Sequence, residues 1–326
     1  MHDSRRTHGA CPIWPREEII TGERLQALAD VTIITGPIQR FHKSLPADVA
    51  RARLPGTMQT IELEQLSNIG PFRLRSAAAT ARRIDEAMAP LQRAHSIFVY
   101  THLLPAFIEH VLPRLTQHFV LITHNSDGLI TDRYRPLLDD IRIERWFAQS
   151  ALITHPKLEC LPIGPANAQW RHGNLDSLIS AINAEPSDLG LVYANFKPST
   201  HPDRQPLLDL IQSRPFMTLE SGVSFETYLA HVAGHRFCLS PPGNGIDAHR
   251  TWEALYLGTI PIVTTSFAAT FPALPMLGVD SWADIDPDML DAAEARLAPR
   301  WANLEQLRLS HWKNRIATAR ARAMPE

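Results

Sequence analysis

Cysteine is scarce in this sequence of 326 residues. It occurs three times, at Cys11, Cys160 and Cys238, and no two of these positions form a CxxC pair. An odd number of widely spaced cysteines excludes a disulfide framework and predicts reduced thiols. We therefore expect a cytoplasmic protein held together by an ordinary apolar core, since 44% of its residues are hydrophobic.

Long apolar runs and an excess of one charge are missing too. No stretch reaches the ~20 apolar residues of a transmembrane helix, and residues 1–18 contain arginines but no apolar signal-peptide segment. The net charge of -2 and the isoelectric point near 6.7 argue against nucleic acid as a partner. A charged ligand would have to be bound by a local group of residues.

Strand-like runs alternate with helical spacing along the chain. They include residues 31–36, 96–100, 120–123, 189–195, 236–239 and 259–263. Such alternation is typical of parallel sheets covered by helices, so we expect an α/β fold. Glycine, proline and asparagine gather in residues 165–174, which predicts a loop near a domain boundary. We place the domains at 1–185 and 186–300, followed by a C-terminal helix in 301–326.

The most informative stretch lies in residues 236–263. A short apolar run is broken by two prolines and two glycines between Pro241 and Gly245, and a second run of strand formers starts at Thr259. Between them we expect a helix that begins with Asp247 as N-cap and ends before Gly258 at the C′ position. The stretch therefore predicts a strand, loop, helix and strand in series.

One side of this predicted helix is polar. At ~100° per residue, His249, Arg250 and Glu253 fall together, opposite the side that carries Trp252 and Leu255. The loop before the helix places glycine backbone at a helix N-terminus, where free N–H groups favour a phosphate. Arg250 would bind phosphate oxygens, and Glu253 would accept hydrogen bonds from ribose hydroxyls. The alternative is an ordinary solvated helix surface.

The same stretch resembles a known family. Residues 240–262 read SPxGNGIDxHRxWEALxxGxIPI, which resembles the donor-site signature of exostosin-like glycosyltransferases, that is, glycosyltransferase family 47 and its bacterial and viral relatives. WFAQ at 146–149, LPIG at 161–164, AN at 166–167 and WxHG at 170–173 resemble the central block of that family. The motifs cover most of residues 119–265.

The resemblance implies a GT-B architecture, in which two Rossmann-like domains with parallel sheets face each other across a cleft. It implies an inverting, metal-independent hexosyl- or pentosyltransferase of surface-glycan synthesis, with no cofactor. Its donor would be a nucleotide sugar, with a UDP-sugar as the first expectation. Its acceptor would be a glycan, a lipid-linked glycan or another hydroxyl compound, bound on the side of residues 1–185, with the donor in 186–300.

The expected site residues fall into three groups. Donor binding is assigned to Gly243, Asn244, Gly245, Asp247, His249, Arg250, Glu253, Arg204 and Asn195. Asp127 or His124, at the end of a predicted strand, would be the catalytic base, and Asn125, Asn167 and His172 would line the acceptor side. Two alternatives stay open: residues 124–128 as an Asx-turn or helix cap, and Arg204 as a surface residue near a helix start.

Two motifs that can signal a metal are interpreted otherwise. The His231 and His235 pair lacks the glutamate of a zinc helix, and Asp284 and Asp286 precede a predicted helix that aspartate would cap. No metal site is therefore predicted.

A C-terminal helix is expected over residues 301–323, with Trp301, Leu309, Trp312 and Ile316 on one side and basic residues along its length. It would either pack across both domains, returning to the first, or make a peripheral contact with an anionic membrane. Two rivals to a transferase remain. One is a nucleotide-sugar epimerase of the same fold, and the other is an inert nucleotide-binding module.

Overall fold

A computed structural model describes residues 14–35, 59–63 and 77–324. The chain divides into two compact units, which are described separately below. Unit 1 comprises Met1–Ile20 and Gly164–Arg308, and unit 2 comprises Thr21–Ile163 and Leu309–Glu326. The boundary expected near residue 185 stays a prediction, and so does the cleft between two domains. Cys160 and Cys238 are free thiols, whereas Cys11 lies outside the described residues.

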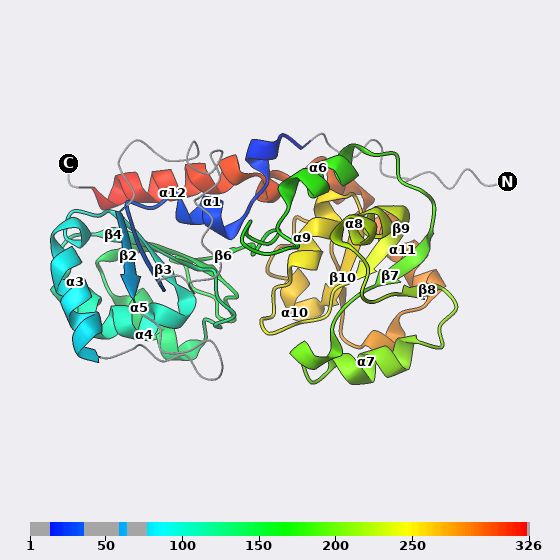
Figure 1. Cartoon of the computed structure of the whole chain (residues 1–326), viewed down its shortest axis with the longest axis horizontal. Helices are drawn as coiled ribbons and strands as arrows, with labels where there is room; N and C mark the ends of the chain where they lie inside the picture. The colour runs from blue at the N-terminus through cyan, green and yellow to red at the C-terminus, as the bar shows by residue number, and fades with distance from the viewer. Residues whose placement is uncertain (1–13, 36–58, 64–76, 325–326) are drawn as a thin grey trace. The chain divides into compact units, whose positions relative to one another are not determined.

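Unit 2 is built on a six-stranded sheet in which all pairings are parallel, in the order β2-β1-β3-β4-β5-β6 (Figure 1). Its strands are β1 (Val31–Thr35), β2 (Gln59–Leu63), β3 (Ser96–Tyr100), β4 (Phe119–His124), β5 (Ile143–Gln149) and β6 (Leu158–Leu161). β3 and β4 are apolar and buried, as expected for central strands covered on both faces.

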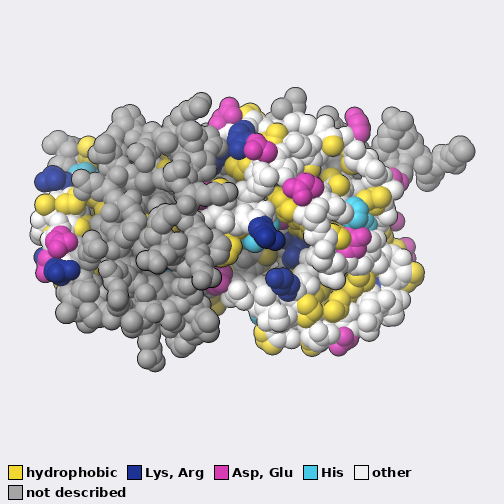
Figure 2. All heavy atoms as spheres, viewed as in Figure 1, with side chains coloured by type: hydrophobic (Ala, Val, Ile, Leu, Met, Phe, Trp, Pro, Cys, Tyr) yellow, Lys and Arg dark blue, Asp and Glu magenta, His cyan; other side chains and the backbone are white. Residues whose placement is uncertain are grey.

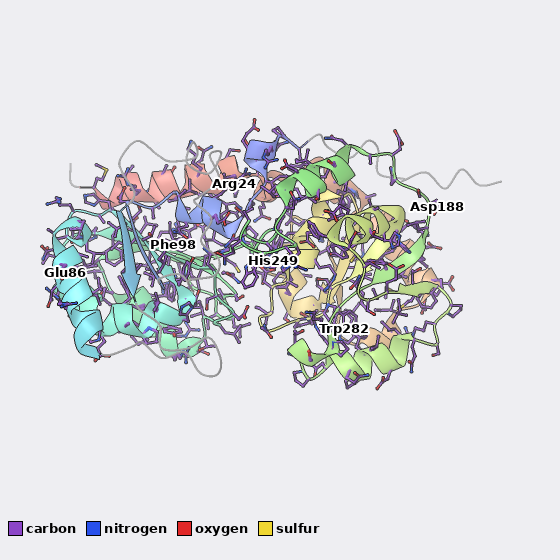
Figure 3. The ribbon with its side chains drawn as sticks, in the orientation of Figure 1. Arg24, Glu86, Phe98, Asp188, His249 and Trp282 are labelled. Carbon is purple, nitrogen blue, oxygen red and sulfur yellow. The ribbon has the colours of Figure 1, made fainter. Side chains whose placement is uncertain are left out.

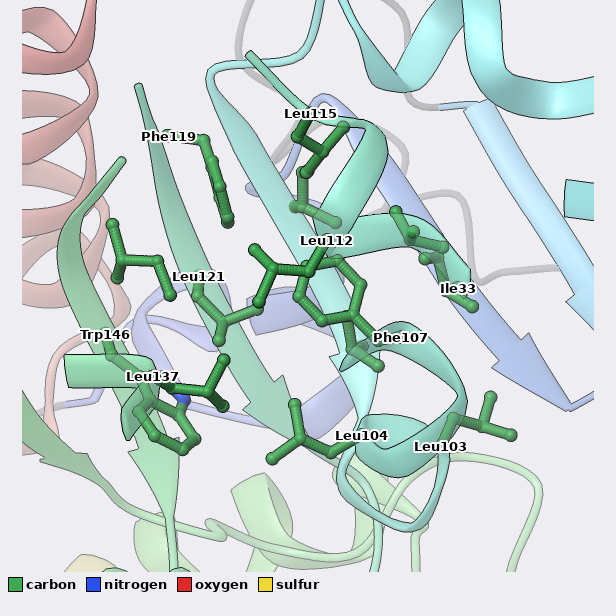
Figure 4. Packing of buried hydrophobic residues seen from close by; sticks show 14 of the residues in the cluster. Ile33, Leu103, Leu104, Phe107, Leu112, Leu115, Phe119, Leu121, Leu137 and Trp146 are labelled. Carbon is green, nitrogen blue, oxygen red and sulfur yellow. The ribbon is translucent and has the colours of Figure 1, made fainter. Parts of the chain in front are cut away.

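The helices of unit 2 are α1 (Gly22–Gln26), α3 (Ala77–Leu91), α4 (Leu104–Ala106), α5 (Arg135–Asp139) and α12 (Leu309–Ala323). Figure 4 shows part of the core that packs α3, α4 and α5 against the sheet, which includes Phe107, Leu121 and Trp146. The Trp146 indole N–H donates to Thr123 Oγ1 at 2.9 Å. The first residue of the WFAQ motif is thus a core residue.

The C-terminal helix is shorter than predicted. It starts at Leu309, whereas residues 298–302 and 305–307 form separate 3-10 turns. Asn303 interrupts the helix because its φ of -130° and ψ of 86° are not helical. The apolar side of α12 is buried, with Trp312 and Ile316 at most 2% exposed, and the helix contacts β4 and β5. These side chains are therefore not offered to a membrane.

Unit 1 carries a five-stranded parallel sheet in the order β11-β10-β9-β7-β8. Its strands are β7 (Gly190–Ala194), β8 (Met217–Leu219), β9 (His235–Leu239), β10 (Ile260–Thr264) and β11 (Leu277–Val279). Its helices are α6 (Leu175–Asn183), α7 (Arg204–Ile211), α8 (Phe225–Gly234), α9 (His249–Tyr256), α10 (Thr265–Ala268) and α11 (Pro287–Leu297). The strands predicted at 189–195, 236–239 and 259–263 and the helix predicted before Gly258 are present, whereas α6 and α10 were not predicted.

The predicted α/β class with two Rossmann-like parallel sheets is confirmed. In each sheet the strand order reverses between the first and the third strand in sequence, namely β1 and β3 in unit 2 and β7 and β9 in unit 1. In open parallel sheets, ligands bind beyond the carboxyl ends of the strands at such a reversal. In unit 1 these ends lead into residues 195–204 and 240–248, which include the glycine loop.

Candidate functional site

The loop after β9 is fixed to the helix that follows it. Gly243 N–H donates to Gly245 O at 2.9 Å, which closes a tight turn. The Ser240 and Thr251 hydroxyl oxygens lie 2.8 Å apart and are buried, so they link the start of the loop to α9. Gly245 is buried, whereas Asn244 is exposed at the tip. The loop is therefore a defined structure that leads directly into a helix N-terminus.

The start of α9 differs from the prediction. The N-cap residue is Ala248, which supplies no side-chain hydrogen bond, and Asp247 is not the cap. Asp247 instead accepts a hydrogen bond from the indole N–H of Trp252 at 2.6 Å. The carboxylate is turned into the interior, because the buried indole needs an acceptor there. As predicted, Gly258 follows the helix at the C′ position, with a φ of 74°.

Arg204, at the start of α7, binds this loop through hydrogen bonds to its backbone. Its guanidinium donates to Pro242 O at 2.7 Å, Pro241 O at 2.9 Å, Thr200 Oγ1 at 2.6 Å and Lys197 O at 3.2 Å. These bonds take four of the five N–H groups of an arginine. Burial, and then the positive charge of Arg250, lower the pKa of Arg204 to about 10. Arg204 is thus not a surface arginine, and it shapes the loop with its charge intact.

A second guanidinium stands close to the first. Arg250 is half-buried on the first turn of α9, and its Nε is buried with no hydrogen-bond partner among the described residues. Within that described part, no ion pair joins Lys197, Arg204 or Arg250 to a carboxylate. A group of cations that form no ion pairs, beside an uncapped helix N-terminus, favours an anion.

Glu253 lies on α9 next to these cations, but it is not on an exposed face as the helical spacing predicted. It is 3% exposed, because α8 covers it and the Tyr228 hydroxyl donates to its Oε2 at 2.8 Å. Burial raises the pKa of Glu253 to about 7, although the Tyr228 hydrogen bond and the Arg250 charge act the other way. Glu253 can therefore change charge near neutral pH.

Residues 164–173 approach the N-terminus of α9 from another side. His249 Nδ1 lies 2.6 Å from Gly164 O, and the rings of His172 and His249 are 6.0 Å apart. Asn167 O accepts from Trp170 N–H at 3.0 Å, which bends the segment back on itself. Partial burial, and then the charge of Lys197, lower the pKa of His172. His172 is thus close enough to Lys197 for the positive charge of that residue to affect its protonation.

The views of the surface agree with this grouping. Figure 3 labels His249 in unit 1, and Figure 2 shows dark blue and cyan atoms of Lys, Arg and His together near that position. We use the term cation group for Lys197, Arg204 and Arg250; His172 and His249 lie beside it.

Asn195 follows β7 and joins a polar chain that sequence spacing did not reveal. Its Nδ2 donates to the Tyr193 hydroxyl at 3.0 Å, and that hydroxyl donates to Glu220 Oε2 at 2.9 Å. His231 Nδ1 lies 2.5 Å from the same oxygen. Tyr193, Glu220 and Tyr228 come from three separate elements, so no single motif could have indicated them.

In unit 2, His124 and Asn125 lie at the carboxyl end of β4. His124 is fully buried, with Nδ1 3.0 Å from Asn125 Oδ1 and Nε2 3.0 Å from Pro162 O. Burial lowers the pKa of His124. A Cβ at Gly22 would lie 1.7 Å from Asn125 Oδ1, so only glycine fits there. Of the two candidates for the base, Asp127 is exposed and His124 is enclosed.

The motifs that can signal a metal are occupied by structural contacts. Asp286 is the N-cap of α11 and accepts from Met289 N–H at 2.8 Å. His235 Nε2 lies 3.0 Å from Thr218 Oγ1. Among the described residues, no group of three or more His, Cys, Asp or Glu is placed to hold a metal ion. Nor is any helix in this part of the chain both long and apolar enough to cross a membrane.

Comparison with known proteins adds the following findings. No family model matches the chain, and no curated protein matches it. Solved structures similar to it include an α1,3-fucosyltransferase, with 11% identity, a TM-score of 0.39 and coverage of 85% of this chain and 80% of that chain. Another is a GtfA/B complex, with 10% identity, a TM-score of 0.41 and coverage of 77% and 63%.

A third is AviGT4, a glycosyltransferase involved in avilamycin A biosynthesis, with 12% identity, a TM-score of 0.43 and coverage of 90% of this chain and 97% of that chain. TM-scores this low, at such identities, establish no shared function. The chain is thus an α/β protein with two parallel sheets, and its function has to be argued from the residues of the site.

Proposed function

We propose that the chain is a glycosyltransferase that uses a nucleotide sugar, and that unit 1 binds the donor at the reversal point of its sheet. The observation that carries the proposal is the cation group around the loop Pro241–Gly245. Arg250 has a buried Nε without a hydrogen-bond partner among the described residues, beside an uncapped helix N-terminus. A diphosphate would supply the missing acceptor and the missing negative charge.

Each predicted donor residue except Asn195 is given a role here. Gly243, Asn244 and Gly245 provide backbone close to the phosphates, and Arg250 binds a phosphate oxygen. Arg204 holds the loop through the Pro241 and Pro242 carbonyls. Asp247 accepts the hydrogen bond of the Trp252 indole, and His249 contacts the carbonyl oxygen of Gly164. Glu253 accepts hydrogen bonds from the ribose hydroxyls.

The cations would also act on the reaction. When the bond between the anomeric carbon and the diphosphate breaks, the electron pair stays on the leaving phosphate oxygen. Positive charge that is already in position stabilises that oxygen as its charge grows. We assign this task to Arg250 and the helix N-terminus, which makes a divalent cation unnecessary.

The acceptor hydroxyl has to lose a proton as it attacks. Asp127 is our choice for the base, since its carboxylate is exposed, whereas His124 is enclosed by Asn125 and Pro162. Attack opposite the leaving group gives inversion. The exostosin-like assignment, the glycan or lipid-linked acceptor, and the roles of Asn125, Asn167 and His172 on the acceptor side belong to the same proposal and rest on the sequence motifs.

The test is isothermal titration of the full chain with UDP, GDP, CDP and dTDP in EDTA and again in magnesium. We expect one nucleoside diphosphate to bind in EDTA, with Arg250→Ala weakening it by about 100-fold because a charge-assisted phosphate contact is lost. Arg296→Ala is the matched control, since Arg296 is exposed on α11 of the same unit. Binding to none of the four by the folded protein would refute the proposal.

A further inference from the structure

Asn195 and Glu220 are brought together by the register of two strands. β7 and β8 are parallel neighbours, and Ala194 pairs with Leu219 at their carboxyl ends. Asn195 therefore directly follows β7, and Glu220 directly follows β8. Both lie at the edge of the sheet where the glycine loop also lies. The Tyr193 hydroxyl bridges them, 3.0 Å from Asn195 Nδ2 and 2.9 Å from Glu220 Oε2.

The single proton of that hydroxyl determines how the amide is turned. Burial raises the pKa of Tyr193, so the phenol keeps its proton. It donates this proton to the Glu220 carboxylate, and towards Asn195 it can only accept. The amide must therefore present Nδ2 to Tyr193, and its Oδ1 is directed elsewhere.

The Glu220 carboxylate is used on one side only. His231 Nδ1 and the Tyr193 hydroxyl both approach Oε2. Neither Glu220 Oε1 nor Asn195 Oδ1 accepts a hydrogen bond from the described residues, and neither oxygen is enclosed. Although burial alone would raise it, the hydrogen bonds from His231 and Tyr193 keep the pKa of Glu220 below its usual range. The group displays two acceptor oxygens, Glu220 Oε1 and Asn195 Oδ1, together with the second N–H of the Asn195 amide.

Two tyrosines connect this pair of acceptors with the residue assigned to the ribose. The Tyr193 and Tyr228 rings are 6.1 Å apart, and Tyr228 donates to Glu253. Gly222, two residues after Glu220, is exposed, and a Cβ added there would meet no atom within 4 Å. We expect a base attached to a ribose at Glu253 to extend along these two tyrosines towards Asn195 and Glu220.

We propose that Glu220 and Asn195 read the base of the donor nucleotide and select guanine. This inference rests on the proposed donor site. The Watson–Crick edge of guanine carries two neighbouring donors, N1–H and N2–H2, which match a carboxylate and an amide oxygen. Uracil and thymine offer one N–H between two carbonyl oxygens, which a carboxylate repels. Cytosine and adenine each place an acceptor nitrogen beside their amino group.

The inference changes the first expectation for the donor from a UDP-sugar to a GDP-sugar. It is tested by titrating the full chain with GDP, UDP, CDP, ADP and inosine diphosphate, which lacks the 2-amino group. We expect GDP to bind at least 10-fold more tightly than UDP, CDP and ADP, with inosine diphosphate in between. A site that hydrogen-bonds a group rejects a ligand lacking it, because buried polar atoms are left unpaired.

Two variants complete the test. Glu220→Gln keeps the shape but removes the charge, so GDP should lose at least 10-fold in affinity while UDP binding stays the same. Glu185→Gln, an exposed position in the same unit, should change neither. UDP binding as tightly as GDP, or a GDP preference that survives Glu220→Gln, would overturn the base assignment and leave the donor site standing. If no nucleoside diphosphate binds to the folded protein, the donor site falls as well.

Discussion

The two sheets share a strand order but differ in what surrounds the reversal of that order. In unit 1 the loops after β7 and β9 bring Lys197, Arg204 and Arg250 around a glycine turn. In unit 2 the residues after β3 include His102, whose pKa burial lowers to about 4. The same topology thus offers a place for a ligand twice, but among the described residues only unit 1 fills it with positive charge.

The arginines beside the glycine loop differ in the same way from the arginines of unit 2, and also from Arg236 of unit 1, which pairs with Asp291 and Glu294. In unit 2, Arg142, Arg315 and Arg320 form ion pairs with Asp140, Glu159 and Asp30. Arg204 and Arg250 of unit 1 have no such carboxylate partner among the described residues. Guanidinium groups that are brought together and not neutralised cost stability, which a bound anion would offset. This difference supports the proposal that unit 1 binds the donor.

The largest expected effect is on the rate of sugar transfer and not on the affinity for the nucleotide. Asp127→Asn should lower the transfer rate by about 10²–10⁴, because the acceptor hydroxyl loses its base. Nucleotide affinity should be unchanged, since Asp127 belongs to unit 2 and the proposed donor residues belong to unit 1. The measurements are the transfer rate from the GDP-sugar and the affinity for the nucleotide by titration. If the protein uses the UDP-sugar instead, the transfer rate is measured with that donor. Normal turnover in the variant would remove Asp127 from the mechanism.

Arg204→Ala should damage unit 1 in two ways. It leaves the carbonyls of Pro241 and Pro242 without their donors, which we expect to cost about 3 kcal/mol of unfolding free energy. Nucleotide binding should weaken by at least about 100-fold, because the loop loses its shape along with a positive charge. Urea unfolding and titration measure the two effects. Arg214→Ala, which frees the carbonyls of Ala283 and Ile285 away from the loop, should reduce stability without a matching loss of binding.

Gly22→Ala tests unit 2, which has no part in the proposed donor site. The added methyl group would overlap Asn125 Oδ1 and lie 2.9 Å from His124 Nδ1, so we expect a loss of about 2 kcal/mol in the stability of unit 2. Nucleotide affinity should not change. Gly222→Ala serves as the comparison variant. An added methyl group there would meet no atom within 4 Å, although the φ of 74° is a backbone angle that alanine rarely adopts. A drop in nucleotide binding with Gly22→Ala would mean that the turn after β4 takes part in donor recognition.

The smallest effect concerns the pH dependence of Glu253. Its pKa is raised to about 7 in the folded protein, so its contribution to stability is fully present below the unfolded pKa near 4.5 and is lost as pH rises through 7. Glu253→Gln should therefore match the wild type at pH 4 and exceed it by roughly 1–3 kcal/mol at pH 8. Unfolding in urea at both pH values measures this. A constant difference between the two proteins would show that Glu253 keeps an ordinary pKa.

Ligand binding should show the opposite trend. If Glu253 binds the ribose as proposed, its ionised form would accept hydrogen bonds more strongly than the protonated form, so affinity should fall as pH drops below 7. In Glu253→Gln the affinity should be lower and no longer depend on pH in this range.

The sequence predicted best what is contiguous in the chain. The strands flanking the glycine loop, Gly258 after α9 and the position of Arg250 on its first turn all follow from local spacing. The spacing also placed Glu253 on the polar side of α9 but gave no sign that Tyr228 covers it. The helical period describes one helix, and the neighbour that packs on it comes from another part of the chain.

The positions that could not be predicted depend on contacts between distant segments. The inward turn of Asp247 depends on a buried indole, and the enclosure of His124 depends on Pro162, 38 residues away. Glu220 and Asn195 come together only because β7 and β8 are neighbours in register. Such residues carry no signal in a single sequence, since their role is created by the pairing of strands.

The most direct test of the difference between the two units is hydrogen exchange of the full chain with and without a saturating nucleoside diphosphate. We predict slower exchange in residues 195–204 and 240–258 of unit 1 and unchanged exchange in residues 119–128 of unit 2. Protection confined to residues 119–128, with none at the glycine loop, would contradict the assignment of the donor site to unit 1.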